Sequence, residues 1–541
     1  MGTTLLLFLL CISRAVSENI DEMLRKHDSE IKDVLELSEN EKKELKKQEK
    51  NIIDVKQDHV SSSGDDILEI NMMDHTSGVY QGDMMLTESQ VEDIKEDIEE
   101  VFAEKNGNVT EYRSRRKRQT FRDSRYPDTT WTDGVYYFFH SNATPKVQGV
   151  FKKGAQAWEN YTCIDFHEDE NAKHKIQVFV QNGCWSFVGR TRRPQQELSL
   201  GQGCDSVGTA AHEIGHALGL WHTQSRHDRD RFITLDAANI KKDWLSQFTK
   251  ETRATNYNYN ITYDYGSIMH YGYRASSHNK EPTIVPKDQL YAQTLGSPFI
   301  SFYELLMINK HYNCLEKCKP ETSAKCQMNG FPNPRDCTKC VCPSGFGGDL
   351  CDERPSGCGK ILNATAVYQT LEDTLGNFYQ GGVREDFTKC NYWIQAPNDS
   401  RIEVKIESFT RGLAVDGCKY AGVEIKTHKD LRLTGYRFCA PEDNNVTLVS
   451  NYHIVPVITY NRAYASKTIL KYRIAPDDLT ENTTKQPKTT GITTKKPKAS
   501  SDCKDDERSC PRMLKLKDFC NGPHYSQRLK ERICKKSCNL C

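Results

Sequence analysis

The stretch "TAAHEIGHALGLWHTQSRHDRD" (209–230) carries three histidines and a glutamate in a pattern that predicts a helix running into a turn. On a helix, His212 and His216 are four residues apart and lie on the same side, which suits two imidazole ligands of one zinc ion. Glu213 lies beside them on another face. It cannot be a third ligand there, but it can take a proton from a water molecule, which is the general-base step of hydrolysis.

A glycine and a third histidine follow this predicted helix. Gly219 adopts left-handed backbone angles at low cost, so the chain can leave the helix and return His222 to the metal. Three neutral imidazoles and a water molecule make an open, catalytic zinc site rather than a closed structural one. The alternative is an amphipathic helix with surface histidines. The complete H-E-x-x-H-x-x-G-x-x-H pattern favours the zinc site.

The segments around this stretch must position it. After Gln119 the sequence becomes aromatic and alternating, as in "WTDGVYYFFH" and "KIQVFVQ", which predicts strands. Helical patterns follow around 147–160 and 205–221. These elements predict a mixed α/β or α+β domain of about two hundred residues.

Features of the whole chain indicate a secreted protein of several modules. The chain has 541 residues, too many for one compact domain. Residues 1–17 are typical of a signal peptide, because the apolar run from Leu5 to Ile12 is too short to span a bilayer and small residues follow at Ala15 and Ser17. No later apolar run reaches membrane length, so we expect no membrane anchor.

The cysteine and charge counts indicate the compartment of the protein and the class of its partners. Loss of the signal peptide would remove Cys11 and leave 20 of the 21 cysteines, an even number that suits disulfides in an oxidising compartment. Asn-x-Ser/Thr triplets along the chain fit glycosylation there. Formal charges balance, 74 against 74, which gives no support to nucleic-acid binding. We therefore expect extracellular protein partners.

Residues 18–118 have the composition of a propeptide. They contain no cysteine and are rich in Lys and Glu, which predicts solvated helices with little ability to bury a core. The segment ends in "RSRRKRQT", in which Arg115 to Arg118 form a basic cluster of the kind that secretory-pathway convertases cut after. The alternative is an exposed basic loop. The change of composition directly downstream favours cleavage between Arg118 and Gln119.

Several further motifs lie in order along residues 119–314. They are "CWSFVGR" at 184–190, "SLGQGC" at 199–204, "SRHDRD" after the third histidine and "YDYGSIMHYG" around Met269. Together with the zinc pattern they resemble the astacin family of metzincin proteases, in the form of nematode-type secreted enzymes. The resemblance implies an α+β protease domain over 119–314, with a mixed sheet and a zinc helix, that binds one Zn²⁺ ion.

The resemblance also implies a role for each site residue. The three histidines would bind the zinc and Glu213 would be the general base. Tyr271 would be a distant extra ligand that swings to stabilise the oxyanion once substrate binds. Met269 would lie in a turn beneath the metal. The alternative for Tyr271 is a packed core tyrosine.

Two disulfides and a substrate-binding strand follow from the same resemblance. It implies that Cys163 pairs with Cys314 and that Cys184 pairs with Cys204. The "SLG" segment would be an edge strand to which an extended substrate peptide adds by main-chain hydrogen bonds.

Two more residues are expected to control the latency of the zymogen and the substrate specificity of the enzyme. The propeptide motif of the family is Phe-x-Gly-Asp, whose Asp binds zinc in place of the water, and the match here is "YQGD", with Tyr80 for Phe. We expect Asp83 to be this zymogen latch; the alternative is an ordinary Gly-Asp turn. Many astacins favour an acidic residue just after the cut. Arg274 is the available cation after the methionine turn, and we expect it to contribute to that subsite.

Four segments follow the protease domain in the sequence. Residues 315–353, with six cysteines and "CVCPSGFGGDLC", resemble an EGF-like module. Residues 358–474, with the alternating run "RIEVKIESF", resemble a CUB β-sandwich. A Thr-, Lys- and Pro-rich linker (475–502) precedes a six-cysteine segment (503–541) that matches the ShKT spacing.

The motifs together predict a secreted zinc endopeptidase, made as a zymogen, that hydrolyses proteins of the matrix, cuticle or egg envelope. The CUB and EGF-like modules would bind matrix partners. The alternative is an extracellular interaction scaffold in which the EGF-like, CUB and ShKT modules act and the protease domain is inert. Inert relatives usually lack the glutamate or a histidine, and the sequence here retains all of them.

Overall fold

The computed structural model of the chain describes residues 28–76, 78–105, 126–252, 256–377 and 382–476, together with the single residues Thr120, Cys510, Cys520, Ser537 and Cys538. The chain divides into two compact units, Met1–Glu481 and Asn482–Cys541. The signal peptide, the cleavage site at Arg118 and Gln119, and nearly all of the linker and of the ShKT segment lie outside the described residues. In the second unit, a disulfide joins Cys520 to Cys538.

The described part of the predicted propeptide, here called the prosegment (28–105), forms four helices and one short strand. They are α2 (Asp28–Leu35), α3 (Glu39–Glu49), α4 (Ile67–Met73), β1 (Met84–Met85) and α5 (Glu88–Lys105). Helix α3 begins with a capping box between Ser38 and Glu41. Apolar prosegment side chains such as Leu68 and Val91 pack into a core shared with the rest of the first unit. This agrees with the prediction that the segment has little core of its own.

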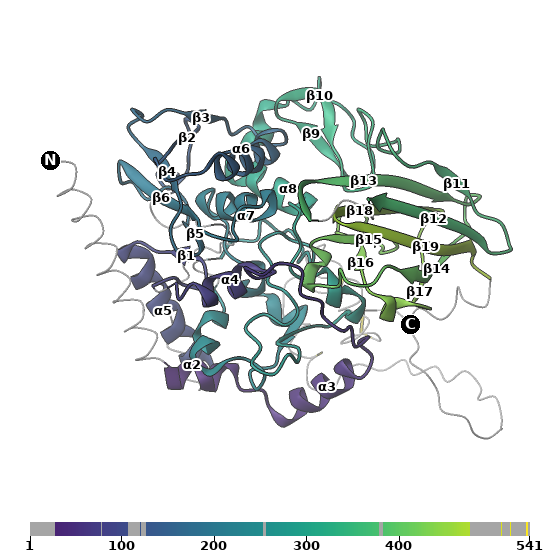
Figure 1. Cartoon of the computed structure of the whole chain (residues 1–541), viewed down its shortest axis with the longest axis horizontal. Coiled ribbons are helices and arrows are strands. Elements are labelled where there is room, and N and C mark those ends of the chain that lie inside the picture. Colours follow the sequence, from purple (N-terminus) through teal and green to yellow (C-terminus); the bar gives the residue numbers. More distant parts are fainter. Residues whose placement is uncertain are drawn as a thin grey trace. The chain divides into compact units, whose positions relative to one another are not determined.

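The α+β module (126–313) is built on a six-stranded sheet with the order β1-β5-β6-β4-β2-β3. Its own strands are β2 (Val135–Phe139), β3 (Phe166–Glu168), β4 (Lys175–Phe179), β5 (Cys184–Phe187) and β6 (Gln195–Leu200). Neighbouring strands are parallel, except for the antiparallel pair β5 and β6. Figure 1 shows these strands on one side of the helices α6 and α7.

The prediction that "SLG" forms the edge strand is wrong. Ser199 and Leu200 belong to β6, which lies between β4 and β5 in the sheet. The outer strand of the module's own sheet is β5, and the prosegment strand β1 adds to it. Sequence alternation marks a strand but not its neighbours, because strand order is decided by contacts between distant segments. An extended peptide would therefore add to β5.

The module has three α-helices in its described part, of which α7 carries site residues. They are α6 (Pro145–Glu159), α7 (Val207–Ala217) and α8 (Phe302–His311). Helix α6 begins at Thr144, whose side chain accepts the Val147 backbone N–H, and Pro145 occupies the first turn. Both helices predicted from the sequence, around 147–160 and 205–221, are confirmed by α6 and α7.

Helices α6 and α7 pack closely because small residues face one another. A Cβ atom at Gly154 would lie 3.0 Å from the Ala211 backbone nitrogen. The loops around these helices contain one small antiparallel ribbon and several short 3₁₀ helices. These are β7 (Ile233–Leu235), β8 (Ile284–Pro286), η1 (Thr223–Ser225), η2 (Arg229–Arg231), η3 (Lys242–Phe248), η4 (Gln289–Thr294) and η5 (Cys314–Lys317).

A small module (318–351) follows, held by three disulfides around one hairpin. The hairpin pairs β9 (Phe331–Asn333) with β10 (Asp336–Val341). The disulfides are Cys318–Cys337, Cys326–Cys340 and Cys342–Cys351. Because so few residues bury little apolar surface, these crosslinks carry much of the module's stability.

The sandwich module (358–476) consists of two sheets. The first has the order β11-β13-β18-β15-β16 and the second the order β12-β19-β14-β17. Their strands are β11 (Ile361–Asn363), β12 (Gln369–Gly376), β13 (Val383–Gln395), β14 (Ile402–Phe409), β15 (Ala421–Ile425), β16 (Tyr436–Phe438), β17 (Thr447–Val449), β18 (Ile454–Ala463) and β19 (Ala465–Ile474), with the short helices η6 (Asp416–Cys418) and η7 (Pro441–Asp443). Disulfides Cys358–Cys390 and Cys418–Cys439 crosslink the module. The predicted multidomain fold, an α+β domain followed by a disulfide-rich module and a β-sandwich, is confirmed.

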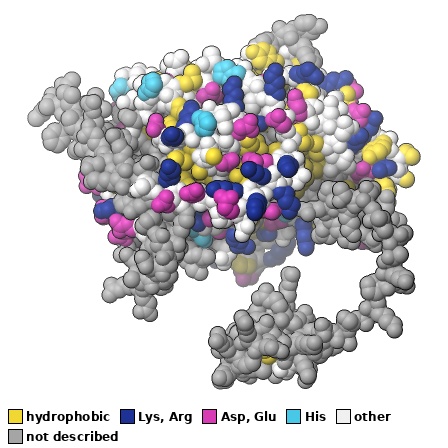
Figure 2. All heavy atoms as spheres, turned by 90° about the horizontal axis from the view of Figure 1, so that it is seen from below, with side chains coloured by type: hydrophobic (Ala, Val, Ile, Leu, Met, Phe, Trp, Pro, Cys, Tyr) yellow, Lys and Arg dark blue, Asp and Glu magenta, His cyan; other side chains and the backbone are white. Residues whose placement is uncertain are grey.

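Charged side chains of both signs are interspersed over the face seen in Figure 2. This distribution accords with the balanced formal charge of the sequence. None of the helices in the described part of the chain combines the length and the apolar character that a membrane span requires.

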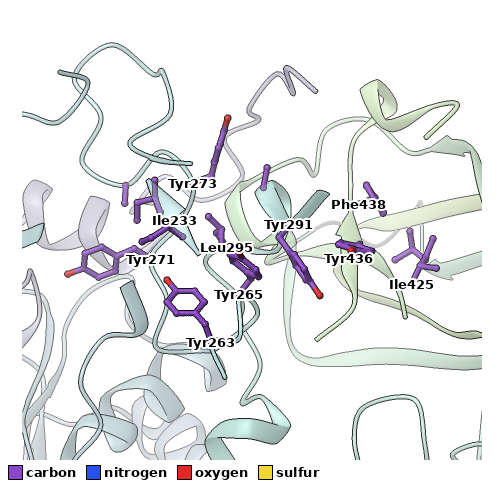
Figure 3. Close-up of a cluster of buried hydrophobic side chains, with 14 of the residues drawn as sticks. Ile233, Tyr263, Tyr265, Tyr271, Tyr273, Tyr291, Leu295, Ile425, Tyr436 and Phe438 are labelled. Carbon is purple, nitrogen blue, oxygen red and sulfur yellow. The ribbon is translucent and has the colours of Figure 1, made fainter. Parts of the chain in front are cut away.

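The α+β module and the sandwich module share one hydrophobic core. Figure 3 shows tyrosines of the first module beside Tyr436, Phe438 and Ile425 of the sandwich. The ring centroids of Tyr291 and Tyr436 are 4.5 Å apart, and the Tyr291 hydroxyl donates to the Thr434 carbonyl oxygen at 3.1 Å. Packed aromatic rings therefore join the two modules.

We expect Tyr436→Ala to destabilise this shared core by about 3–5 kcal/mol, the usual cost of truncating a large buried aromatic side chain. Thermal unfolding should show a lower midpoint, and limited proteolysis should cut faster between the modules. Tyr452→Ala is the matched control, because Tyr452 lies in the same module with its side chain 42% exposed. Equal unfolding midpoints for the two variants would contradict the shared core.

Candidate active site

Helix α7 carries two of the predicted zinc ligands and the predicted base. It begins at Ser206, whose side chain accepts the Thr209 backbone N–H at 3.1 Å. His212, Glu213 and His216 are all buried on this helix. The helix is apolar on nearly every face because the sheet, α6 and the loop around Met269 enclose it.

The third histidine returns to the helix through a left-handed turn. Gly219 has φ +101°, and the backbone N–H groups of Gly219 and Leu220 donate to the carbonyl oxygens of His216 and Gly215. Such a reversal favours glycine, because other residues are strained at this φ. His222 then lies with its ring centroid 4.8 Å from that of His216, as the spacing predicts.

Backbone carbonyl groups fix the orientation of the two helical imidazoles. His212 Nδ1 donates to the Ile268 carbonyl oxygen at 2.7 Å, and His216 Nδ1 donates to the Leu220 carbonyl oxygen at 2.8 Å. In the neutral ring, this leaves the Nε2 lone pairs free for a metal. Met269 lies directly beneath, since a Cβ at Gly215 would be 2.8 Å from its sulfur.

The three histidines converge on Asp83 of the prosegment. The Nε2 atoms of His212, His216 and His222 lie 3.2, 3.4 and 3.1 Å from its carboxylate oxygens. Two ligand atoms that are each about 2.0–2.1 Å from one tetrahedral zinc ion lie roughly 3.3 Å apart. Two imidazole lone pairs aimed at a buried carboxylate would repel it unless a cation lay between them. The geometry and donor set therefore fit a zinc ion held by these four residues.

Burial keeps the imidazoles in the state that binds metal. It lowers the pKa of His222 to about 4 and also lowers the pKa of His216, in both cases against the opposing effect of Asp83. Burial alone would raise the pKa of Asp83, but the three imidazoles outweigh it and hold that pKa well below its ordinary value. An anionic carboxylate that faces the neutral rings of His216 and His222 is the charge pattern of a metal ligand set.

Glu213 is buried beside this cluster with its carboxylate uncommitted. Among the described residues, neither of its oxygens has a hydrogen-bond partner. Burial raises the pKa of Glu213 well above its ordinary value, and the Asp83 carboxylate raises it further. A carboxyl group of raised pKa and free lone pairs is suited to accept a proton near neutral pH.

The prosegment reaches the cluster through a turn that requires glycine. Gly82 has φ +83°, and a Cβ there would lie 2.1 Å from Leu68 Cδ2. Tyr80, which replaces the Phe of the family motif, is 1% exposed and contacts Glu251 through its hydroxyl at 3.3 Å. The Ser186 backbone N–H donates to the Asp83 carbonyl oxygen at 3.1 Å, which ties the turn to β5.

Two prosegment residues that the sequence did not predict also contribute to this arrangement. Asn71 donates to the carbonyl oxygens of Gly82 and Cys184, both at 2.7 Å, and so joins α4 to β5. Gln81 Oε1 lies 3.2 Å from His222 Nδ1 and accepts the Ser225 hydroxyl at 2.7 Å. Gln81 stands at the variable position of the motif, and no sequence pattern marked Asn71.

Tyr271 lies against the third histidine. Its ring centroid is 4.5 Å from that of His222, and its hydroxyl donates to the Gln81 carbonyl oxygen. Burial raises the pKa of Tyr271 well above its ordinary value, so the hydroxyl remains a donor. The structure thus brings Tyr271 to the cluster, where it holds a backbone carbonyl group of the prosegment.

Arg274 contacts the sandwich module. Its backbone N–H donates to Asp416 Oδ2 at 2.6 Å, and its guanidinium lies 3.4 Å from Asp416 Oδ1. It also donates to the Val55 carbonyl oxygen of the prosegment and lies over the Tyr273 ring. None of these contacts in the described part of the chain involves the histidine cluster.

The structure has both disulfides that the resemblance implied for this module. Cys163 is joined to Cys314, and Cys184 is joined to Cys204. The second bond ties β5 to the loop before α7, so it braces the strand that lies next to the site. Arg118 and Gln119 are not among the described residues.

Comparisons with known proteins agree with this site. The sequence profile of the astacin peptidase family matches residues 123–313. The zinc metalloproteinase nas-31 of Caenorhabditis elegans is 44% identical over 435 residues, which cover 80% of this chain and 70% of that protein. Zinc metalloproteinase nas-32 of the same organism is 39% identical over 351 residues, 64% of this chain and 53% of that protein.

The chain is also similar to a solved structure of a zinc-protease. High choriolytic enzyme 1, a hatching enzyme zinc-protease from Oryzias latipes, is 30% identical, with a TM-score of 0.32, over 36% of this chain and 94% of that chain.

Proposed function

Because this chain belongs to the astacin family and is a zinc metalloendopeptidase, we propose that it is secreted as a zymogen and hydrolyses extracellular proteins with Glu213 as general base. The observation that carries the proposal is the convergence of three imidazoles on Asp83, with the uncommitted Glu213 carboxylate beside them.

The chain's own residues account for the chemical steps. Bound zinc supplies a Lewis acid that lowers the pKa of water and polarises a carbonyl group. Glu213 accepts the proton of the attacking water at a carboxylate oxygen and returns it to the leaving amine. The Tyr271 hydroxyl, which donates to the Gln81 carbonyl oxygen in this structure, donates instead to the oxygen of the scissile peptide.

Strand β5 positions the substrate in this proposal. Its backbone pairs with β1 of the prosegment, so the same N–H and C=O groups become available once the prosegment leaves. An extended substrate adds to this edge by main-chain hydrogen bonds, which bind a peptide largely independently of its side chains.

The prosegment keeps the enzyme latent. Asp83 would hold the zinc together with the three histidines, and Tyr80, Gln81 and Gly82 fill the space where a substrate would lie. Cleavage after Arg118 separates this segment from Gln119 onward. Small EGF-like and ShKT modules and the CUB-like sandwich then serve as contacts to matrix, cuticle or egg-envelope proteins.

The alternative of an inert scaffold requires a defect at the site. Zinc-binding histidines and the base are all present and buried in one cluster, which supports the enzyme instead.

The function is tested by hydrolysis of casein or gelatin by the processed full-length protein. We expect cleavage that a chelator abolishes and added zinc restores, because the histidine cluster needs the metal to act. Cleavage that persists at full rate after the metal content has fallen to zero would refute the zinc mechanism. No cleavage by zinc-loaded, processed protein would favour the scaffold.

A further inference from the structure

A cavity of about 230 Å³ adjoins the histidine cluster, and the sandwich module forms one of its walls. Asp83, His212 and Tyr271 line it on one side. Lys419, Tyr420 and Arg462 of the sandwich line it on the other. A module outside the protease domain thus reaches the space beside the reacting groups.

Three cations of the sandwich line this wall, Arg384, Lys419 and Arg462, and none of them has an ion-pair partner among the described residues. Arg384 donates to the carbonyl oxygens of Tyr464 and Asn461. Arg462 is 9% exposed, and its Nε donates to the Lys419 carbonyl oxygen at 3.1 Å. Its guanidinium lies over the Tyr420 ring, 5.1 Å from the centroid, which fixes its direction. By contrast, Lys146 on the other side of the cavity is paired with Asp205 at 2.5 Å.

Carboxylates of the prosegment face this wall in the precursor. Asp65 accepts the Tyr420 hydroxyl at 2.7 Å. Burial lowers the pKa of Lys419, and the charges of Asp66, Asp65 and Asp416 oppose that shift. The prosegment therefore supplies negative charge that faces Lys419, whereas the carboxylate that acts on Arg462 is Asp205 of the α+β module.

The backbone of the prosegment is also held by the sandwich. Asp58 N–H donates to the Ala414 carbonyl oxygen at 2.7 Å, and Ala414 N–H donates to Asp58 Oδ2 at 2.9 Å. The sandwich loop therefore binds the prosegment at Asp58 through a reciprocal pair of hydrogen bonds.

Release of the prosegment changes the charge of the cavity. Asp65, Asp66 and Asp83 leave together, and Lys419 and Arg462 remain in the wall of the cavity. The carboxylates that stay already have partners, because Arg274 engages Asp416, Lys146 pairs with Asp205 and Lys153 pairs with Glu385. The wall then carries an excess of positive charge, which attracts an anionic ligand.

We propose that Lys419 and Arg462 of the sandwich module form a binding site for an acidic side chain of the substrate. This inference rests on the proposed protease function, and it assigns part of the substrate specificity to the sandwich. Arg274, which the sequence favoured for this role, instead anchors Asp416 and holds the sandwich loop in place.

The first test is cleavage profiling of a proteome-derived peptide library with the processed full-length enzyme. Wild type should enrich Asp or Glu at one position by about tenfold or more, the size of a charge-assisted contact. Lys419→Gln and Arg462→Gln should each lower this enrichment several-fold, and the double variant should lose it. Arg411→Gln, an exposed cation of the same loop, is the control and should retain it.

A second test does not depend on catalysis. A peptide of residues 58–70, "DHVSSSGDDILEI", is titrated against processed Glu213→Gln protein freed of its prosegment, beside the same peptide with Asp65 and Asp66 changed to Asn. The Glu213→Gln protein should bind the acidic peptide about tenfold more tightly than the Asn-substituted peptide. When Lys419→Gln and Arg462→Gln are added to it, the protein should bind both peptides equally.

The outcomes separate the two proposals. If the preference for acidic substrate residues survives in the double variant, or if only Arg274→Gln removes it, the proposed sandwich site is wrong. The proposed protease function stands in both cases. Failure of the wild-type enzyme to cleave any peptide overturns the function, and the peptide titration still decides the site. Thermal unfolding of each variant shows whether it is folded.

Discussion

Glu213→Gln is expected to lower kcat by about a hundred- to ten-thousand-fold, the range that one general acid–base residue contributes. The amide is nearly isosteric and cannot accept the proton of the attacking water. Zinc content should stay near one per chain, because none of the metal-facing atoms belongs to Glu213. Peptide hydrolysis and elemental analysis of the same sample measure the two effects.

The matched comparison separates loss of the base from loss of the metal. His222→Ala should lose both zinc and activity, because one of three imidazole ligands is removed. His167→Ala, an exposed histidine of the same module, should retain both. Near-normal hydrolysis by zinc-loaded Glu213→Gln would contradict the assignment of the base, and tight stoichiometric zinc in His222→Ala would place the third ligand elsewhere.

Latency should depend on Asp83 and on the cut after Arg118. Replacing Arg118 by Ala should trap an inactive precursor, because the prosegment stays attached and its carboxylate continues to face the three imidazoles. Combining this change with Asp83→Ala should raise the precursor's activity at least about tenfold, since a charge-assisted contact contributes about 1.5–3 kcal/mol. Fluorogenic peptide cleavage by the purified precursors measures this.

The control is Asp33→Ala in the same uncleaved precursor, because Asp33 is an exposed prosegment carboxylate away from the site. It should leave latency unchanged. A precursor with Arg118→Ala that cleaves peptides as fast as the mature form would refute the latch.

Local spacing was sufficient to identify the metal-binding helix. His212 and His216 share a face because of the helical period, and Gly219 permits the left-handed turn that returns His222. These relations involve residues within one or two turns of each other, so the sequence alone determines them. The convergence on Asp83 could be expected only through the family motif, since 129 residues separate it from His212.

The tertiary structure decided the features that depend on distant segments. Strand order made β5, not the "SLG" strand, the outer strand of the module's own sheet. Packing of the sandwich against the α+β module paired Arg274 with Asp416 and placed Lys419 beside the site. Such contacts depend on how whole modules bury their apolar faces against one another, and no local periodicity of the sequence records that choice.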